Sequence, residues 1–278
     1  MNQARSWNQD LSFAGRRTTV EGVNLPAAKD QDRYGVATDC VVVTDGVTPL
    51  DPAGGPAVQR FAADVVATVL AGNDRELPGL LRAAVAQNPG GAPGAAPACT
   101  LGVARAVRAA AGTRIELASL ADTAVYVRRR DGSLLTCLDD RVSGAEARTT
   151  GIFYRALLDG ASPEQARRAV ATGSGGRRAQ RNTPGSYWVL ADEPAAADEP
   201  VVVHVDPADV ETMLVCSDGF SRAWELLGVL AGPEDALEAG RTLAEVTDQI
   251  RTAELWRSRS PWPLFGGPDD ITALRLQF

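Results

Sequence analysis

The sequence predicts an α+β fold in which sheets are covered by helices. Short runs of β-branched and apolar residues alternate, in mixed order, with longer segments whose apolar residues recur at helical spacing. Between residues 99 and 138 the strand-like runs follow one another, and Asp131-Gly132 is typical of a hairpin turn, so we expect mostly antiparallel pairing. No repeat and no long linker divides the 278 residues, which indicates one domain over 1–278.

The first part of the chain is expected to form strands followed by two helices. Trp7, Leu11 and Phe13 lie in partial alternation, which is typical of a strand. Three valines in a row at Val41–Val43 predict a buried strand. The predicted elements are a strand in 5–14, a strand at the end of the polar segment 29–36, a strand at 41–44, helices over 54–72 and 76–87, and a loop at 88–98.

The second part is expected to continue as an antiparallel meander and to end in helices and a last strand. Ser162 and Pro163 suit the N-cap and the first position of a helix. The predicted elements are strands at 100–107, 114–120, 124–127 and 133–138, helices over 150–158 and 163–172, a turn from 181 that enters a strand by 190, strands at 201–205 and 211–216, helices after 219, near 232–240 and over 242–257, and a strand at 271–278.

Composition and charge argue against several functional classes. A net charge of −7 disfavours a nucleic-acid surface, and the basic clusters at 128–130 and 177–178 are short enough to be solvated strand ends or loops. Arg, Asp and Gly interrupt every apolar run, which argues against membrane spans, and no signal-peptide pattern follows the first residues. We therefore expect a cytoplasmic protein with neither nucleic acid nor a membrane as its partner.

The cysteines and the histidine leave carboxylates as the groups that carry chemistry. The four cysteines form no C-x-x-C pair, so we expect reduced, mostly buried thiols. His204 is the only histidine, so a His-rich zinc site is excluded and a Ser-His-Asp triad would have to use this residue. Its position between two valines is more typical of a structural strand residue. If the protein is an enzyme, its catalysis therefore rests on carboxylates.

Aspartates recur at the ends of predicted strands. The Val41–Thr44 strand leads directly into Asp45-Gly46, and the Met213–Cys216 run leads through Ser217 into Asp218-Gly219. Two further acidic segments are Asp122, after an alternating run, and Asp269-Asp270, before the last strand. Carboxylate and carbonyl oxygens are the ligands that Mg²⁺ and Mn²⁺ prefer, and two such ions can activate a water for attack at phosphorus. The alternative is a set of ordinary strand-end turns.

In chain order the acidic segments read Asp30-Gln31-Asp32, Thr44-Asp45-Gly46, Ala121-Asp122-Thr123, Ser217-Asp218-Gly219 and Asp269-Asp270-Ile271-Thr272. The set resembles the N-E-D, D-G, G-D-S, S-D-G and D-N-x-T motifs of the metal-dependent protein phosphatases, the PPM or type 2C Ser/Thr phosphatase family. Each motif alone is weak, but five in this order over nearly the whole chain are fairly specific. The stretch Arg181–Val189 also resembles a divergent, actinobacterial-type branch of that family.

The resemblance implies a layered α-β-β-α sandwich, with two mostly antiparallel sheets flanked by helices. It also implies a Mg²⁺- or Mn²⁺-dependent hydrolase that removes phosphate from phosphoserine or phosphothreonine of a protein substrate in bacterial signalling. The nucleophile of such an enzyme is a water that bridges two metal ions.

The resemblance further implies a role for each matching residue. Asp45 would bridge two ions, of which one is also bound by the Gly46 carbonyl group. Asp218 and Asp269 would hold the other ion, so that Asp45 and Asp218 belong to the catalytic centre. The remaining implied roles are the binding of a third, weaker ion by Asp122 and the orientation of a metal-bound water by Asp32, which is counted with the catalytic residues.

Two departures from the family pattern concern charge and phosphate binding. The glutamate of the first motif is replaced by Gln31, which accepts hydrogen bonds but carries no charge. The arginine that grips the substrate phosphate would fall near Ala27, where the sequence has none. Lys29 and Arg33 are the candidates to bind the phosphate in its place, with Arg17 as a third.

The other departures lie in the remaining motifs. Ala121 and Thr123 replace the glycine and serine of G-D-S, Thr48 lies in the region of the histidine of eukaryotic members, and Asp270 replaces the asparagine of D-N, which adds negative charge. Together these changes keep the metal ligands and weaken the phosphate grip.

Three interpretations besides a protein phosphatase therefore remain open. The first is a non-catalytic, regulatory module of the same fold, the second a phosphatase of a small phosphorylated metabolite, and the third an α+β domain whose acidic turns are accidental. The proline- and glycine-flanked segment 258–268 and the acidic loop 191–200 would be ordinary surface loops, or they would cover the site or contact a partner.

Overall fold

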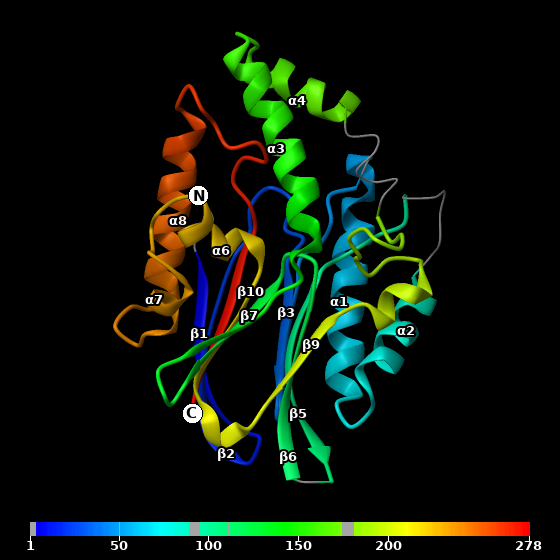
Figure 1. The fold of residues 1–278 in the computed structure, drawn as a ribbon, viewed down its shortest axis with the longest axis vertical. Coiled ribbons are helices and arrows are strands. Elements are labelled where there is room, and N and C mark those ends of the chain that lie inside the picture. Colours follow the sequence, from blue (N-terminus) through cyan, green and yellow to red (C-terminus); the bar gives the residue numbers. More distant parts are fainter. Residues whose placement is uncertain (1–3, 50, 89–94, 111, 174–180) are drawn as a thin grey trace.

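Two antiparallel sheets lie face to face and carry helices on both outer sides (Figure 1). The computed structural model describes residues 4–49, 51–88, 95–110, 112–173 and 181–278. The layered α-β-β-α sandwich expected from the sequence is thus confirmed. Most of the predicted loop at 88–98 lies outside the described residues, as do Arg177 and Arg178.

One sheet has six strands in the order β1-β2-β11-β10-β7-β8. The sequence did not predict β2 as a separate strand; it follows a tight turn in which Ala14 and Gly15 both have positive φ. Helices α6, α7 and α8 pack on the outer face of this sheet. The bounds are β1 Arg5–Phe13, β2 Arg16–Leu25, β7 Ala124–Arg129, β8 Leu134–Cys137, β10 Val210–Cys216, β11 Ile271–Gln277, α6 Asp218–Glu225, α7 Pro233–Leu237 and α8 Leu243–Ser258.

The other sheet has five strands in the order β3-β4-β5-β6-β9. Helices α1 and α2 cover its outer face, because the apolar stripe of α1, which includes Phe61 and Val65, packs on Val42 and Val103. The bounds are β3 Arg33–Ala37, β4 Cys40–Thr44, β5 Leu101–Ala109, β6 Gly112–Leu120, β9 Val201–Val205, α1 Gly55–Ala71 and α2 Leu77–Gln87. Short 3₁₀ turns lie at Pro52–Gly54, Asp140–Val142, Pro194–Asp198 and Pro207–Asp209.

The prediction of a strand after the turn at residue 181 is wrong. Leu190 forms only an isolated bridge with Cys99, although the loop before it does turn as expected. The edge of β6, where a further strand could pair, is already taken by β9. The predicted structural role of His204 is consistent with its place in β9, where Nε2 lies 3.4 Å from the Glu116 carboxylate.

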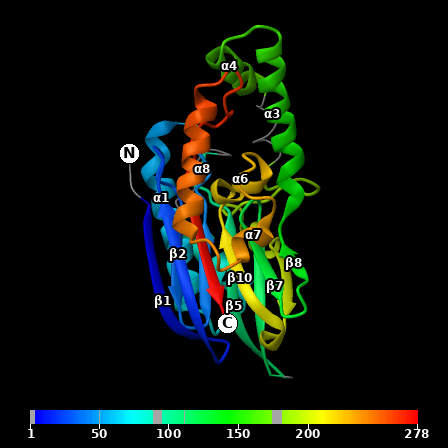
Figure 2. The ribbon, with the colours of Figure 1, turned by 90° about the vertical axis from the view of Figure 1, so that its left-hand side faces the viewer.

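Helices α3 (Ser143–Leu158) and α4 (Pro163–Gly173) form an arm above the ends of the strands (Figure 2). Helix α3 begins at Ser143, seven residues before the predicted start at 150. Phe153 is fully buried in a small cluster that also contains Val170 and Phe265, so that the arm is attached to the segment before β11. This arm places the first turns of α3 over one end of the sandwich.

The interior between the sheets is apolar and contains no disulfide among the described residues. Cys40, Cys99, Cys137 and Cys216 are all free and buried, as predicted. Within the described ranges, no helix has the length and apolar character that crossing a membrane requires.

Candidate active site

All the acidic segments found in the sequence meet at one end of the sandwich, below the α3–α4 arm. Asp45, Asp122 and Asp218 follow the carboxyl ends of β4, β6 and β10, while Asp32 and Asp269 precede β3 and β11. Antiparallel neighbours run in opposite directions, so the end of one strand lies beside the start of the next. The hydrogen-bonded pairs β3–β4 and β10–β11 have this arrangement, which gathers residues from distant parts of the chain.

Both Asp-Gly turns require glycine for steric reasons. A Cβ atom on Gly46 would lie 2.5 Å from Val58 Cγ1 and 2.7 Å from Gln31 Cβ. A Cβ atom on Gly219 would lie 1.9 Å from the carbonyl oxygen of Asp270, which is backbone and cannot easily move. Each glycine therefore lets the chain that follows an acidic residue pass close to a neighbouring segment.

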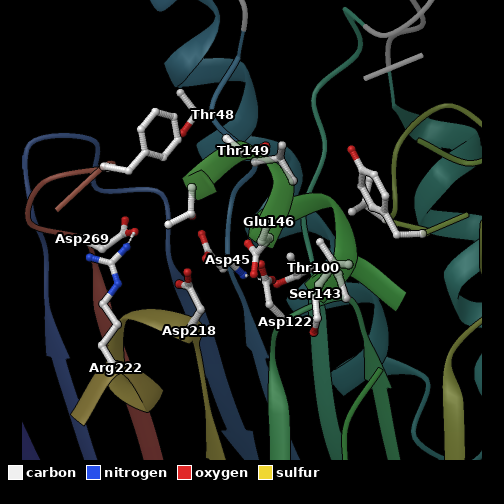
Figure 3. A pocket seen from close by; sticks show the side chains of 18 of the residues that line it. Asp45, Thr48, Thr100, Asp122, Ser143, Glu146, Thr149, Asp218, Arg222 and Asp269 are labelled. Atoms are coloured by element: carbon white, nitrogen blue, oxygen red, sulfur yellow. Dashed lines mark hydrogen bonds and ion pairs between the residues drawn. The ribbon is translucent and has the colours of Figure 1, made fainter. Parts of the chain in front are cut away.

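A cavity of about 680 Å³ opens between these strand ends and the arm. Asp45, Asp122, Asp218 and Asp269 line it together with Lys29. Figure 3 shows Asp45, Asp122 and Asp218 directed into the middle of the cavity from the ends of three different strands. In the same view Asp269 lies apart from these three, with its carboxylate beside the Arg222 guanidinium.

Asp45 and Asp218 form the electrostatic centre of the cavity. Burial raises the pKa of Asp45 well above its usual range, and the charges of Asp32, Asp218, Asp269 and Asp122 raise it further. Burial and Asp269 also raise the pKa of Asp218, whereas Arg222 and a hydrogen bond with Asp45 lower it. The Oδ1 atom of Asp218 is buried and has no hydrogen-bond partner among the described residues. Two neighbouring carboxylates with raised pKa values favour a bound proton or a bound cation.

Asp32 lies behind the cavity wall. Its side chain is buried, and Ser217 Oγ donates a hydrogen bond of 2.7 Å to Oδ2. Burial raises the pKa of Asp32 to about 8, with a further contribution from the charge of Asp270 and an opposing one from the Ser217 hydrogen bond. The backbone N–H of Thr272 donates to the same Ser217 hydroxyl group, so this serine joins Asp32 to the start of β11. In this position Asp32 can act through Ser217 rather than by direct contact with a ligand in the cavity.

The carboxylate of Asp270 has a structural role that the sequence did not reveal. It accepts the backbone N–H groups of Ala27, at 2.5 Å, and of Gln31, at 2.6 Å. The charge that was expected to be added at this position therefore fixes the loop before β3. Such charge-assisted hydrogen bonds to backbone N–H groups are among the stronger ones in proteins.

The two cations proposed from the sequence for phosphate binding lie in different places. Lys29 lines the cavity. Arg33 does not, because its Nη1 donates to the backbone carbonyl oxygens of Asp30, at 2.9 Å, and Asp32, at 2.6 Å. Arg17, the third candidate, forms an exposed ion pair with Asp10 on the β1–β2 hairpin.

An ion-pair network on the Asp269 side of the cavity was also missed. Arg222 forms ion pairs with Asp269 and with Glu254, the latter at 2.8 Å, and Arg251 pairs with Glu254 at 2.9 Å. The spacings offered a signal, because Arg222 lies four residues after Asp218 and Glu254 lies three after Arg251 on predicted helices. The spacing did not indicate, however, that α6 and α8 lie against each other.

Side chains of the arm and of the segment before β11 complete the cavity. Figure 3 shows Glu146 directed into the cavity from α3. The sequence offered a partial signal here, because Ser143-x-x-Glu146 matches the capping-box pattern of a helix start. In the structure the N-cap is Val142, which makes no side-chain capping hydrogen bond. Phe265, in the segment 258–268, also lines the cavity, whereas no residue of the acidic loop 191–200 does.

The donor set suits a hydrated divalent cation rather than a ready-made cage. Within the described ranges, no group of three or more His, Cys, Asp or Glu side chains is close enough to form a metal site by itself. Mg²⁺, however, keeps several waters and is commonly held by one or two carboxylates, and Mn²⁺ accepts the same oxygen ligands. Asp45 and Asp218 supply two such carboxylates, and the Asp218 Oδ1 atom, which has no partner in the described ranges, can serve as a ligand. The pair therefore fits such an ion.

Comparison with known proteins identifies the fold. No family model and no curated protein matches the sequence. The structure is similar to that of the photosystem II phosphatase PBCP, with a TM-score of 0.54, 15% identity, and coverage of 94% of this chain and 98% of that one. It is similar to the serine/threonine phosphatase Stp1 from Staphylococcus aureus, with a TM-score of 0.51, 12% identity, and coverage of 100% and 95%.

A third similar structure is the serine/threonine phosphatase PstP/Ppp of Mycobacterium tuberculosis, with a TM-score of 0.50, 20% identity, and coverage of 99% of this chain and 98% of that one. At these identities the likeness concerns the fold. The chain thus has the fold of the PPM Ser/Thr phosphatases over nearly its whole length, as the five ordered motifs predicted.

Proposed function

We propose that the protein is a Mg²⁺- or Mn²⁺-dependent phosphomonoester hydrolase that acts on phosphoserine or phosphothreonine in proteins. The observation that carries this proposal is the pair Asp45 and Asp218, two neighbouring carboxylates with raised pKa values that face a cavity of about 680 Å³. Perturbed carboxyl groups in a cavity are typical of functional sites. The fold, which is that of Ser/Thr phosphatases, supports this class of substrate.

Each residue has a role that follows from its place. Asp45, the Gly46 carbonyl group and Asp218 would hold the ion, and Asp122 and Asp269, at the two sides, would take part in binding further ions. A bound divalent ion supplies an activated water and offsets negative charge on the phosphate group. Asp32 acts through the Ser217 hydroxyl group as a positioning residue.

Of Lys29 and Arg33, the two cations predicted from the sequence, we assign Lys29 to the substrate phosphate because it lines the cavity. A lysine binds phosphate as a point charge and lacks the planar, two-pronged geometry of arginine. We therefore expect weak phosphate binding with the ion supplying most of the attraction. Arg33 is not assigned this role, since its guanidinium donates to backbone carbonyl groups outside the cavity.

The proposal is tested by hydrolysis of para-nitrophenyl phosphate and of a phosphoserine peptide, with Mn²⁺ and with a chelator, on wild type and Asp218→Asn. The expected result is turnover that requires Mn²⁺ and is lost in the variant. Metal-independent turnover, or turnover that survives Asp218→Asn, would contradict the assignment. Sugar and nucleoside phosphates in the same assay separate a protein phosphatase from a phosphatase of small metabolites.

A second candidate is a regulatory module that binds the ion without turnover. It is favoured by the absence of an arginine near Ala27 and by the ion pair of Asp269 with Arg222. This candidate predicts Mn²⁺ binding by calorimetry together with no hydrolysis of any phosphoester. The same two measurements on one sample therefore distinguish the candidates.

A further inference from the structure

Arg222 occupies an unusual place for a cation in a cavity proposed to bind metal ions. It lines the cavity, its side chain is only 14% exposed, and it comes from α6, the helix that also carries Asp218. Its guanidinium donates to the Asp269 carboxylate, to Glu254 at 2.8 Å and to the Gly267 carbonyl oxygen at 3.0 Å. Arg222 is therefore a fixed positive charge on one wall of the cavity.

The carboxylate of Asp269 is correspondingly occupied. Its Oδ2 accepts from Arg222, and its Oδ1 accepts the backbone N–H of Asp270 at 3.1 Å. Asp218 differs, because its Oδ1 is buried without a partner among the described residues. Figure 3 shows the Asp269 carboxylate beside Arg222 and apart from Asp45 and Asp218.

Glu254 keeps Arg222 in this position. This carboxylate is fully buried and lies between Arg222 and Arg251, with ion-pair distances of 2.8 and 2.9 Å. It also accepts the backbone N–H of Asp269 at 3.2 Å. Glu254 thus orients the arginine and the segment that bears Asp269 together, so the contact between them is built into the fold.

We propose that Arg222 is an internal cation that competes with a divalent ion for Asp269. The inference rests on the proposed metal site and deepens it: one ion binds tightly through Asp45 and Asp218, and an ion that needs Asp269 binds weakly because it must first displace the guanidinium. Two cations a few ångströms apart in a partly buried site repel strongly, and the guanidinium must lose its carboxylate partner as well.

The inference is tested by titrating Mn²⁺ into substrate-free protein in a calorimeter. We expect the wild type to show one tight and one weak binding event, and Arg222→Gln to tighten the weak event by at least about tenfold. Arg222→Lys, which keeps the charge, is expected to stay close to wild type. Equal affinities for the weak event in wild type and Arg222→Gln would overturn the inference.

Arg251→Gln is the matched control. Arg251 shares the Glu254 partner and also carries a positive charge near this segment, but its other contacts are the carbonyl oxygens of Leu25 and Asp269 rather than a carboxylate. We expect this variant to change the weak event by less than about threefold. A tenfold gain in Arg251→Gln would show a general charge effect and would overturn direct competition.

A double-mutant cycle identifies the ligand that is released. If Arg222→Gln acts by freeing Asp269, then adding Asp269→Asn to it must abolish the gain. A gain that survives in the double variant would mean that Arg222 acts elsewhere, and the inference would fall.

A measurement on the wild type keeps the test independent of how well Arg222→Gln folds. The Nε–H signal of Arg222 in NMR, identified by its absence from Arg222→Lys, is expected to shift at the Mg²⁺ concentrations that fill the weak site. A signal that stays unchanged to saturation would contradict displacement. Neither experiment uses a substrate, so absence of phosphatase activity, which would count against the proposed function, leaves this test intact.

Discussion

The carboxylates on the two sides of the cavity have opposite electrostatic environments. On one side Asp45 and Asp218 repel each other, and the Oδ1 atom of Asp218 has no hydrogen-bond partner within the described part of the chain. On the other side Asp269 and Glu254 are each paired with an arginine, and Glu254 with two. One helix, α6, joins the two sides, because it carries both Asp218 and Arg222.

The difference separates a binding function from a structural one. A buried charge without a partner costs free energy of folding, so its retention points to something that binds there. A buried charge with two partners is satisfied within the fold, and removing one partner leaves the others uncompensated. The same residue type, aspartate at a strand end, therefore serves two purposes within one cavity.

The largest effect is expected when a carboxylate is removed from the side of the cavity that holds Asp45 and Asp218. Asp218→Asn should lower Mn²⁺-dependent hydrolysis of para-nitrophenyl phosphate by at least about a thousandfold, because the loss of a ligand removes charge stabilisation of the reacting phosphate. Steady-state kinetics measure this. Asp64→Asn, on the exposed face of α1, is the matched control and should change the rate by less than twofold. Comparable losses in the two variants would refute the assignment.

The next largest effect is expected when the ion-pair network on the other side of the cavity is interrupted. Glu254→Gln should lower the free energy of unfolding by about 3 kcal/mol, because Arg222 and Arg251 then face each other without their shared carboxylate. Urea unfolding measures the change. A decrease of less than about 0.5 kcal/mol would show that the network is not needed for the fold and would remove the contrast between the two sides.

A smaller effect of opposite sign is expected for Asp45→Asn without metal. Removing one of two repelling, partly buried carboxylates should raise the free energy of unfolding by about 1 kcal/mol in the presence of a chelator. Thermal unfolding detects this as a higher melting temperature. Mn²⁺ should then stabilise the wild type more than the variant, since only a bound ion adds stability by mass action. A variant less stable than wild type in chelator would contradict the account.

The free energy of unfolding of the metal-free protein is also expected to depend on pH, through Asp32. The pKa of Asp32 is raised to about 8 in the folded protein, so between about pH 4 and 8 the folded state holds a proton that the unfolded state has lost. The stability contributed by this proton is complete below about pH 4 and disappears as the pH rises through 8. Asp32→Asn should flatten this decline, as seen in unfolding curves at a series of pH values. An unchanged slope would place the responsible group elsewhere.

The gathering of the acids was predictable from the sequence because it depends on local patterns. Apolar runs that end in Asp-Gly identify strand ends, and antiparallel pairing brings the ends of neighbours to one edge, so Asp45 and Asp218 were found without any tertiary information. The ordered motifs extended this to the fold, which the similar structures confirm.

The partners of the acids were not predictable, because they depend on which elements pack together. Nothing near Glu254 in the sequence shows that α8 meets the segment before β11, so the pairing of Asp269 with Arg222 escaped notice. Asp270 appeared as an added charge in the site, whereas two backbone N–H groups of a distant loop bind it. Arg33 was similarly assigned by proximity in sequence, and its side chain lies outside the cavity.

The contrast between the two sides is tested most directly by titrating Mn²⁺ into Asp218→Asn and Asp269→Asn side by side, by calorimetry without substrate. Both variants remove one carboxylate from the same cavity. The account predicts that tight binding is lost in Asp218→Asn and is retained within about threefold in Asp269→Asn, whose carboxylate already holds Arg222. Equal loss of tight binding in both variants would contradict it, because Asp269 would then be a ligand of the tightly bound ion.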